Sequence, residues 1–376
     1  MSIKNKFGMC ARTLLAAVSV TSLQSIAAAA PILVGQSASM SGGSAASGKD
    51  ARAGINAYFT AVNRKGGIGG RALELISEDD EGKRDKTLTN TKNLVENRNV
   101  IALLGFTSGA GVESSLQYLA AAKTVMLSPL TGNVAIRENF NRYLFHTRAG
   151  YTDEIALAVK QLRANGLSRY AIVYLEDAKL NGETMRVALA KEKLKPILDI
   201  ALDRNATDFS TQIASISTGN IDAVMFITNG APFTKFVSGL RKLGFNGQLI
   251  TSSFAGTRFV QDAKKDAAGA VVVQVLPPLS KDFLPIVRDF KAHLKEFEAT
   301  AKPNITSFEA YISARVLVEA LQRTKGDVSR EAVVRALEGF GTMDLGGYEI
   351  KFTSTNHDGS KFVDTSVVAR DGSLRY

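Results

Sequence analysis

The sequence predicts an α/β protein with two doubly wound parallel sheets. The chain has 376 residues, which is longer than the roughly 250 to 300 residues at which a single core usually splits into domains. From residue 31 onward, short apolar segments of strand length alternate with longer segments of helical spacing. Such alternation is typical of βα units around a parallel sheet. The alternation runs through two successive series, so we expect two sheets.

The first thirty residues have the pattern of a cleavable Sec signal peptide. Lys4, Lys6 and Arg12 give a positive start, 14–26 is mostly apolar, and the alanines of 27–30 offer the small residues that signal peptidase needs. A membrane anchor is the weaker alternative, because a spanning helix needs roughly 20 apolar residues. We therefore expect a protein that is exported to the periplasm and does not span the membrane.

The composition excludes several kinds of site. Cys10 is the only cysteine and lies in the expected signal peptide, so the mature chain would have no disulfide, cysteine nucleophile or thiolate metal site. The net charge falls from +10 to +7 when the signal is removed, since that segment holds three cations and no acid. Lysines and arginines are scattered among acids and form no basic block, so nucleic acid is not an expected partner.

The first series predicts a sheet with its helices over residues 31–147. Strands are expected at 31–39, 72–77, 100–105, 124–128 and 142–147, and helices at 49–64, 85–98 and 112–122. The glycine cluster 66–70 follows a helix and precedes a strand, whereas a dinucleotide-binding loop follows a strand and opens a helix. It is therefore interpreted as a helix end and turn. The acidic run 78–81 is interpreted as a solvated loop.

The second series predicts another doubly wound sheet. Strands are expected at 170–175, 197–202, 223–228, 248–253 and 270–276, and helices at 152–164, 183–193, 209–217 and 233–243. Pro277 and Pro278 end this alternation. Helices at 283–300, 308–324 and 330–337 and short strands at 348–352 and 365–369 complete the chain.

Two polar, glycine-containing turns stand out at 106–111 and 130–132, each directly after a buried strand. If the two strands are neighbours in one parallel sheet, both turns lie at its carboxyl edge, where such sheets bind ligands. The helix that follows the first turn would offer unpaired N–H groups to an anion. The alternative is that serine and glycine simply end the strands.

Catalytic patterns are not visible. His146, His293 and His357 are too far apart to suggest a metal cluster, and His293 and His357 are expected at the surface. No nucleophile elbow, zinc-protease motif or phosphate loop occurs. We therefore expect a binding protein without a metal or cofactor, not an enzyme.

The order of the motifs resembles the leucine/isoleucine/valine-type periplasmic binding proteins of ABC transporters. The matching pieces are SMSG after the first strand, NRKGGIGGR, ELISEDDEG, LLGFTSGA, LSPLTG and FHTRAGYTDE. The resemblance covers essentially all of the mature chain and implies the bilobed type I periplasmic binding fold. Lobe 1 would comprise 31–147 and 276–345, and lobe 2 would comprise 148–275 and 346–376. Hinge crossings are expected near Arg148, Leu276 and Gly346, with the ligand held between the lobes.

The resemblance also implies a set of ligand-binding residues. In that family the first turn binds a carboxylate through backbone N–H groups and a serine hydroxyl, a position that falls on Ser108 or Gly109, and the second turn adds a threonine, here Thr131. The full expected set is Ser41, Ser108, Gly109, Thr131, Arg148, Tyr151, Leu180, Asn229 and Phe254. Arg148 either clamps a carboxylate or pairs with a nearby acid such as Asp153.

The implied function is that of a solute-binding component of an ABC importer. It would be a monomer that delivers a small carboxylate-bearing molecule, a branched-chain amino acid or a related organic or aromatic acid, to a membrane permease and its ATPase. Places where amino-acid binders present aromatic and acidic groups hold Ser47, Leu180, Ala231 and Phe254, so lobe 2 should offer an apolar wall. Glu176 or Asp177 could still receive an ammonium group. The alternative function is a periplasmic sensor that signals to a receptor partner.

Overall fold

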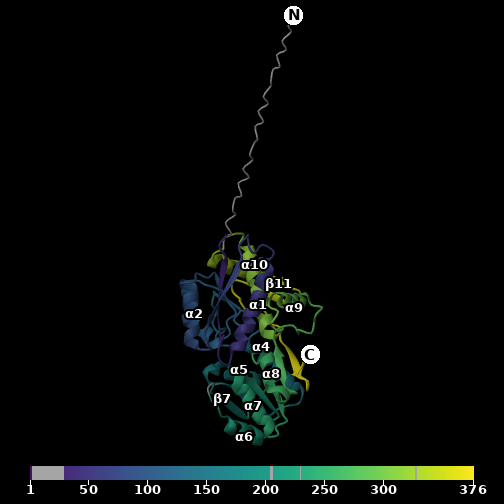
Figure 1. Ribbon diagram of the computed structural model, residues 1–376. Coiled ribbons are helices and arrows are strands. Elements are labelled where there is room, and N and C mark those ends of the chain that lie inside the picture. The colour runs from purple at the N-terminus through teal and green to yellow at the C-terminus, as the bar shows by residue number, and fades with distance from the viewer. Residues whose placement is uncertain (2–28, 204–205, 229, 327) are drawn as a thin grey trace.

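The computed structural model describes residues 1, 29–203, 206–228, 230–326 and 328–376. Within them the chain forms two lobes, one above the other in Figure 1, and each lobe has its own large sheet. We call the upper one lobe 1 and the lower one lobe 2. The predicted α/β class with two sheets is confirmed. The expected signal peptide lies almost entirely outside the described residues.

Lobe 1 is built on a five-stranded sheet in the order β2-β1-β3-β4-β5, in which every pairing is parallel. The strands are β1 (Ile32–Ala38), β2 (Leu73–Asp79), β3 (Ala102–Leu104), β4 (Met126–Leu127) and β5 (Leu144–Phe145). The helices are α1 (Ala45–Asn63), α2 (Arg84–Glu96), α3 (Gly109–Ala122), α9 (Pro285–Phe297), α10 (Ile305–Arg323) and α11 (Arg330–Glu338). Helix α1 packs against α9 and α10, whereas α2 packs against α3.

Lobe 2 is built on a seven-stranded sheet in the order β14-β13-β10-β9-β8-β6-β7. Its parallel strands are β6 (Tyr170–Leu175), β7 (Leu198–Leu202), β8 (Ala223–Ile227), β9 (Gln248–Thr251) and β10 (Val271–Gln274), and β13 (Asp364–Val368) and β14 (Leu374–Arg375) add antiparallel pairs. The helices are α4 (Tyr151–Ala164), α5 (Lys179–Lys191), α6 (Ser210–Thr218), α7 (Gly230–Lys242) and α8 (Gly256–Ala263), with 3₁₀ turns η1 (Glu176–Ala178) and η2 (Lys264–Ala267). The sequence pattern did not predict α8 or β14.

Strand β6 shows why the strands of lobe 2 appear in the sequence as continuous runs of apolar residues. Its residues Ala171, Val173 and Leu175 belong to one buried cluster, while Tyr170 and Ile172 belong to another. Successive side chains of a strand point to opposite faces, so both faces of the sheet are covered. Sheets covered on both faces lose the polar alternation that marks an exposed face.

Helix α10 is the most deeply buried helix segment near the boundary of the lobes. Its start is fixed by a reciprocal cap, in which Asn304 Oδ1 accepts from the Ser307 N–H at 3.0 Å and Ser307 Oγ accepts from the Asn304 N–H at 3.2 Å. Apolar residues surround nearly its whole circumference, and Glu309 is a buried acid among them. No helix of the described part of the chain is both long enough and apolar enough to cross a membrane.

The glycine cluster 66–70 is a turn, as predicted. It follows α1 and precedes β2, and Gly66 and Gly67 have φ of +97° and +69°. A β-carbon on Gly67 would lie 2.1 Å from the carbonyl oxygen of Arg71. Glycine is needed here because the backbone is both left-handed and in close contact with the backbone of Arg71.

The C-terminal crossing differs from the predicted division of the lobes. The predicted boundary at Gly346 assigned 346–352 to lobe 2, yet Ile350 and Phe352 pack in the core of lobe 1. Gly346 and Gly347 form the turn of a hairpin between β11 (Gly341–Asp344) and β12 (Glu349–Phe352), and both of their N–H groups donate to Asp344 Oδ1 at 2.8 Å. The chain therefore reverses at Gly346, and it reaches β13 of lobe 2 only after residue 352.

The expectation that two histidines lie at the surface is wrong for His357, which is buried, and only partly right for His293, which is half-buried. The His357 ring is 4% exposed and stacks on Phe145 with the ring centroids 3.6 Å apart. The backbone carbonyl of His357 also accepts from the His146 N–H at 2.9 Å. His293 is half-buried, with Nδ1 2.8 Å from the Tyr311 hydroxyl. Both residues were misplaced because nothing local in the sequence reveals the aromatic rings that cover them.

Candidate functional site

The first turn of lobe 1 leads into the N-terminus of α3. Ser108 is the N-cap, and its Oγ accepts from the Gly111 N–H at 3.1 Å. This cap starts the helix at Gly109, three residues before the predicted start. The preceding Gly105 has φ of +69°, and a β-carbon there would lie 2.6 Å from Ile55 and 2.9 Å from Gln36. The turn is thus a rigid one that presents a helix N-terminus.

The second turn lies against the first. The Leu130 N–H donates to the carbonyl oxygen of Phe106 at 2.8 Å. A β-carbon on Gly109 would lie 3.2 Å from Thr131 Oγ1 and 2.9 Å from Asn133 Nδ2. The structure therefore brings together the two turns that the sequence singled out. Thr131 is 2% exposed, and its hydroxyl oxygen accepts from the Asn133 N–H at 3.2 Å.

Tyr151 connects this pair of turns to lobe 2. It is the first residue of α4, it is buried, and its hydroxyl lies 3.4 Å from Thr131 Oγ1. A β-carbon on Gly132 would lie 2.5 Å from the Tyr151 ring, so only glycine lets the ring approach this closely. On its other side the ring faces Phe254, with the centroids 6.2 Å apart. Burial raises the pKa of Tyr151, so the hydroxyl stays protonated and can donate.

Arg148 is directed at acids of the chain itself. It is buried, its Nη2 donates to Glu154 Oε1 at 2.6 Å and to Ser253 Oγ, and its Nη1 donates to Glu309 Oε2 at 3.4 Å. Of the two predicted alternatives, this geometry favours pairing with an acid over a ligand clamp. The acids are Glu154 and Glu309, whereas the sequence suggested Asp153, which pairs with Lys361 at 3.2 Å.

The remaining predicted residues are more dispersed. Ser41 is exposed after β1, and its hydroxyl is hydrogen-bonded to the Asp79 carboxylate. This hydrogen bond and the one from the Met40 N–H lower the pKa of Asp79 to about 2. Leu180 is 37% exposed in the first turn of α5. Phe254 is half-buried and packs beside the core around α4. Asn229 lies outside the described residues.

Buried hydroxyls at the carboxyl edge of lobe 2 were missed by the sequence reasoning. Thr228 follows β8, Thr251 ends β9, and Ser252 comes next; all three are at most 4% exposed. Their hydroxyl oxygens have no hydrogen-bond partner in the described part of the chain, nor does Asn181 Oδ1 in the first turn of α5. Polar residues at strand ends were the signal that identified the lobe 1 turns, and the same signal marks 228 and 251–253.

Cavities and metal-ligating groups do not add to this site. One cavity of about 440 Å³ is lined by 246–248 and 268–269 with Arg241, and another of about 570 Å³ lies along the β11–β12 hairpin and 359–362. Neither cavity is lined by residues of the turns at 106–111 and 130–132. In the described ranges, no three histidine, cysteine, aspartate or glutamate side chains gather into a group that could hold a metal ion.

Comparisons with known proteins agree with this architecture. Residues 31–368 match the family described as periplasmic binding protein. The Leu/Ile/Val-binding protein homolog 7 of Brucella abortus is 24% identical over 370 residues, which cover 92% of this chain and 91% of the relative.

Solved structures of the same type superpose on nearly the whole chain. A possible leucine/isoleucine/valine-binding protein from Rhodopirellula baltica is 25% identical with a TM-score of 0.87, over 93% of this chain and 96% of the other. A solute binding protein of an ABC transporter from R. palustris, solved with 4-hydroxybenzoate, is 18% identical with a TM-score of 0.81, over 92% of this chain and 95% of the other. The predicted resemblance is confirmed, and this chain belongs to the periplasmic binding protein family.

Proposed function

We propose that the protein captures a small carboxylate-bearing solute between its lobes and delivers it to an ABC permease and its ATPase. The observation that supports this most directly is the meeting of the α3 N-terminus with Thr131 at the carboxyl edge of the lobe 1 sheet. The first N–H groups of a helix lack intrahelical partners and carry partial positive charge, so they favour an anion.

The carboxylate of the solute would lie against the N–H groups of the first α3 turn. Thr131 would donate its hydroxyl to the same carboxylate, with its oxygen accepting from the Asn133 N–H and from the Tyr151 hydroxyl. Ser108 caps the helix through its oxygen and can donate in the same way. Tyr151, held between Gly132 and Phe254, would cover the body of the solute.

The body of the solute is proposed to be apolar or aromatic with no ammonium group. Glu154 is a buried acid of lobe 2, and its oxygens already accept from Arg148 and Ser253. Burying an unpaired ammonium group costs several kcal/mol. Glu176 and Asp177, the suggested alternatives, are exposed in η1. The R. palustris neighbour binds 4-hydroxybenzoate, which has this kind of body.

The binding test is a thermal-shift and calorimetry panel of leucine, valine, isoleucine, branched 2-oxo acids, benzoate and 4-hydroxybenzoate. A solute at one hundred times its dissociation constant stabilises the folded state by about 2.7 kcal/mol. Stabilisation by the acids without an ammonium group supports the proposal. Micromolar binding of leucine with the oxo acids silent would instead restore the branched-chain amino acid alternative.

The transport role and the location are part of the same proposal. We expect the chain to be processed among 27–30, released with the periplasmic fraction, and purified as a monomer. Co-purification with a permease and ATPase in the presence of solute supports transport. Capture of a receptor or kinase partner in place of the permease would favour the sensor alternative. Recovery of unchanged solute after prolonged incubation separates both from an enzyme.

A further inference from the structure

A buried ionic cluster lies across the boundary of the lobes and has no part in the proposed carboxylate site. Its centre is Arg148, which is 2% exposed and lies in the first crossing after β5. Glu309 comes from α10 of lobe 1, and Glu154 comes from α4 of lobe 2. One guanidinium group therefore pairs with a carboxylate from each lobe, at 3.4 Å and 2.6 Å.

The lobe 2 side of the cluster fixes one particular turn. Glu154 Oε2 accepts from the Ser253 N–H at 2.7 Å, and Glu154 Oε1 accepts from the Ser253 hydroxyl at 2.8 Å. Arg148 donates to the same hydroxyl oxygen. Ser253 immediately precedes Phe254, whose ring faces Tyr151. The cluster thereby sets the position of a residue that the resemblance places at the ligand.

These contacts form a closed path between the lobes. From Glu309 of lobe 1 the path runs through Arg148 to Ser253 of lobe 2. From the neighbouring Phe254 it returns through Tyr151 to Thr131 of lobe 1. Helices α10 and α8 also contact each other across the boundary. A rotation of the lobes that separates Glu309 from Arg148, or Thr131 from Tyr151, would break this path.

The physical cost of the cluster indicates that it has a positioning role. Taking charges out of water costs several kcal/mol per ion, so a buried pair is rarely a net gain over apolar packing, but breaking one is strongly unfavourable. Here two buried carboxylates share one arginine, and Glu309 Oε1 has no hydrogen-bond partner among the described residues. Burial raises the pKa of both Glu154 and Glu309. Such a cluster adds little stability, but it is sensitive to geometry.

We propose that Arg148, Glu154 and Glu309 are positioning residues that hold the two lobes in the orientation seen here even without solute. This inference rests on the proposed function only for its consequence, which is that the Phe254 turn already faces the Thr131 turn before the solute arrives. If only about one tenth of the molecules kept the orientation seen here, the apparent affinity for solute would fall about tenfold.

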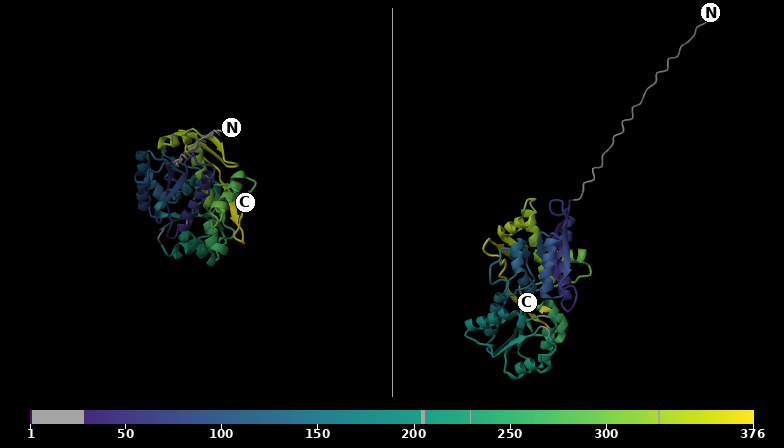
Figure 2. Two further views of the ribbon diagram at one scale, coloured as in Figure 1. Left: turned by 45° about the horizontal axis from the view of Figure 1, so that its top comes forward. Right: turned by 90° about the vertical axis from the view of Figure 1, so that its left-hand side faces the viewer.

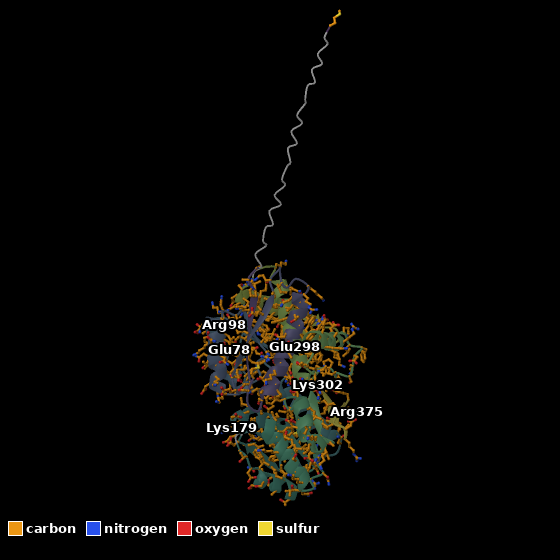
Figure 3. All side chains as sticks on the ribbon, in the orientation of Figure 1. Glu78, Arg98, Lys179, Glu298, Lys302 and Arg375 are labelled. Atoms are coloured by element: carbon orange, nitrogen blue, oxygen red, sulfur yellow. The ribbon has the colours of Figure 1, made fainter. Side chains whose placement is uncertain are left out.

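The first experiment measures the distance between the lobes with no solute present. Beyond residue 30 the sequence has no cysteine, so Arg98→Cys in lobe 1 and Lys179→Cys in lobe 2 supply two exposed spin-label sites (Figure 3). Electron paramagnetic resonance should give one narrow distance distribution for the parent. Glu309→Gln, which keeps the shape of the side chain, and Arg148→Gln should shift or broaden that distribution.

Arg142 provides the matched control. It also pairs with two carboxylates, Glu338 at 2.9 Å and Glu331 at 3.1 Å, but all three residues belong to lobe 1. Arg142→Gln should lower stability without changing the distance between the lobes. Ser253→Ala tests the same path without leaving a buried charge, in case Arg148→Gln fails to fold.

The outcomes separate this inference from the proposed function. Distance distributions of Glu309→Gln and Ser253→Ala that match the parent would mean that the cluster does not set the orientation of the lobes, and the inference would be wrong. The distance measurement needs no solute, so it stands even if 4-hydroxybenzoate and leucine both fail to bind. If 4-hydroxybenzoate does bind, Glu309→Gln should weaken it about tenfold, while Arg142→Gln should leave it unchanged.

Discussion

The carboxyl edges of the two sheets differ in how their polar groups are used. In lobe 1 the buried Asp80 accepts hydrogen bonds from Ser37, Ser39 and Thr87, and Ser108 caps α3. In lobe 2, the hydroxyls of Thr228, Thr251 and Ser252 have no partner in the part of the chain that the structure describes. The two sheets are separate, and the right-hand view of Figure 2 shows strands and helices in both lobes.

This difference indicates that the two sheet edges have different roles in binding. The hydrogen bonds to Asp80 and the Ser108 cap can hold the α3 N-terminus in a fixed position. The lobe 1 edge is not fully paired, since His146 Nδ1, just after β5, also has no partner among the described residues. A buried hydroxyl without a partner costs about 1 to 3 kcal/mol, so each such group needs an explanation, and contact with a bound solute is one. We infer that lobe 1 binds the carboxylate of the solute, whereas lobe 2 contacts the opposite end of the solute.

The largest expected effect concerns the cluster that joins the two edges. Glu154→Ala should lower the free energy of unfolding by about 3 to 5 kcal/mol, because the buried Arg148 loses one of its carboxylate partners. Chemical denaturation measures this. Glu183→Ala is the control, since Glu183 pairs with Arg186 on the surface and is 58% exposed, and surface pairs contribute about 0 to 1 kcal/mol. Equal losses in the two variants would contradict the proposed cost of burial.

The next effect tests the lobe 1 edge. Thr131→Val should weaken binding of 4-hydroxybenzoate and benzoate alike, by roughly ten- to a hundredfold, because a charge-assisted hydrogen bond to a carboxylate is worth about 1.5 to 3 kcal/mol. Isothermal titration calorimetry of both solutes measures the change. Thr342→Val, at an exposed position of β11, is the control. Unchanged affinity in Thr131→Val would remove Thr131 from the site.

A pH experiment separates the lobes by a different property. All three histidines of the sequence lie in lobe 1, and burial lowers the pKa of each. The unfolded chain therefore takes up protons near pH 6.5 before the folded chain does, and stability falls as pH drops below about 6.5. The loss is up to about 1.4 kcal/mol per pH unit for the fully buried His146 and is smaller for the more exposed His293. Hydrogen exchange at pH 5 should show lobe 1 opening before lobe 2, and the reverse order would refute this.

A smaller effect of opposite sign is expected at the lobe 2 edge. Thr228→Val removes a buried hydroxyl that has no partner in the described ranges, so without solute it should raise the free energy of unfolding by about 1 kcal/mol. The same variant should weaken 4-hydroxybenzoate more than benzoate, since only the first has a group for the hydroxyl to contact. Thermal unfolding and calorimetry test the two halves. A loss of stability would show that Thr228 already has a structural partner.

The smallest effect is expected at the exposed pair near the crossing. Lys361 contacts Asp153 at 3.2 Å but is 66% exposed. Lys361→Ala should change the free energy of unfolding by less than about 1 kcal/mol, because solvent screens exposed pairs. Denaturation at low and high salt measures this. A larger loss that disappears in salt would mean that this pair also helps to hold the lobes.

The sequence by itself determined the α/β class, the two sheets and the two lobe 1 turns. Strand β6 was predicted with its observed bounds, and the turns at 108 and 131 were identified, because periodicity and strand-ending residues are local signals. The family resemblance was also readable, since its motifs follow one another in order along the chain. The ligand-binding roles of the whole expected set, the two lobe 1 turns included, remain predictions.

Only the tertiary structure decided which polar side chains pair with other residues of the chain and which remain able to contact a ligand. Arg148 could have faced a ligand, but Glu309, 161 positions away in sequence, accepts from it. His357 and the hairpin at Gly346 were misassigned for the same reason, because burial and pairing depend on which distant segments pack against a residue. Local patterns specify elements and turns, whereas the partner of a side chain is set by the three-dimensional packing of segments that no sequence window contains.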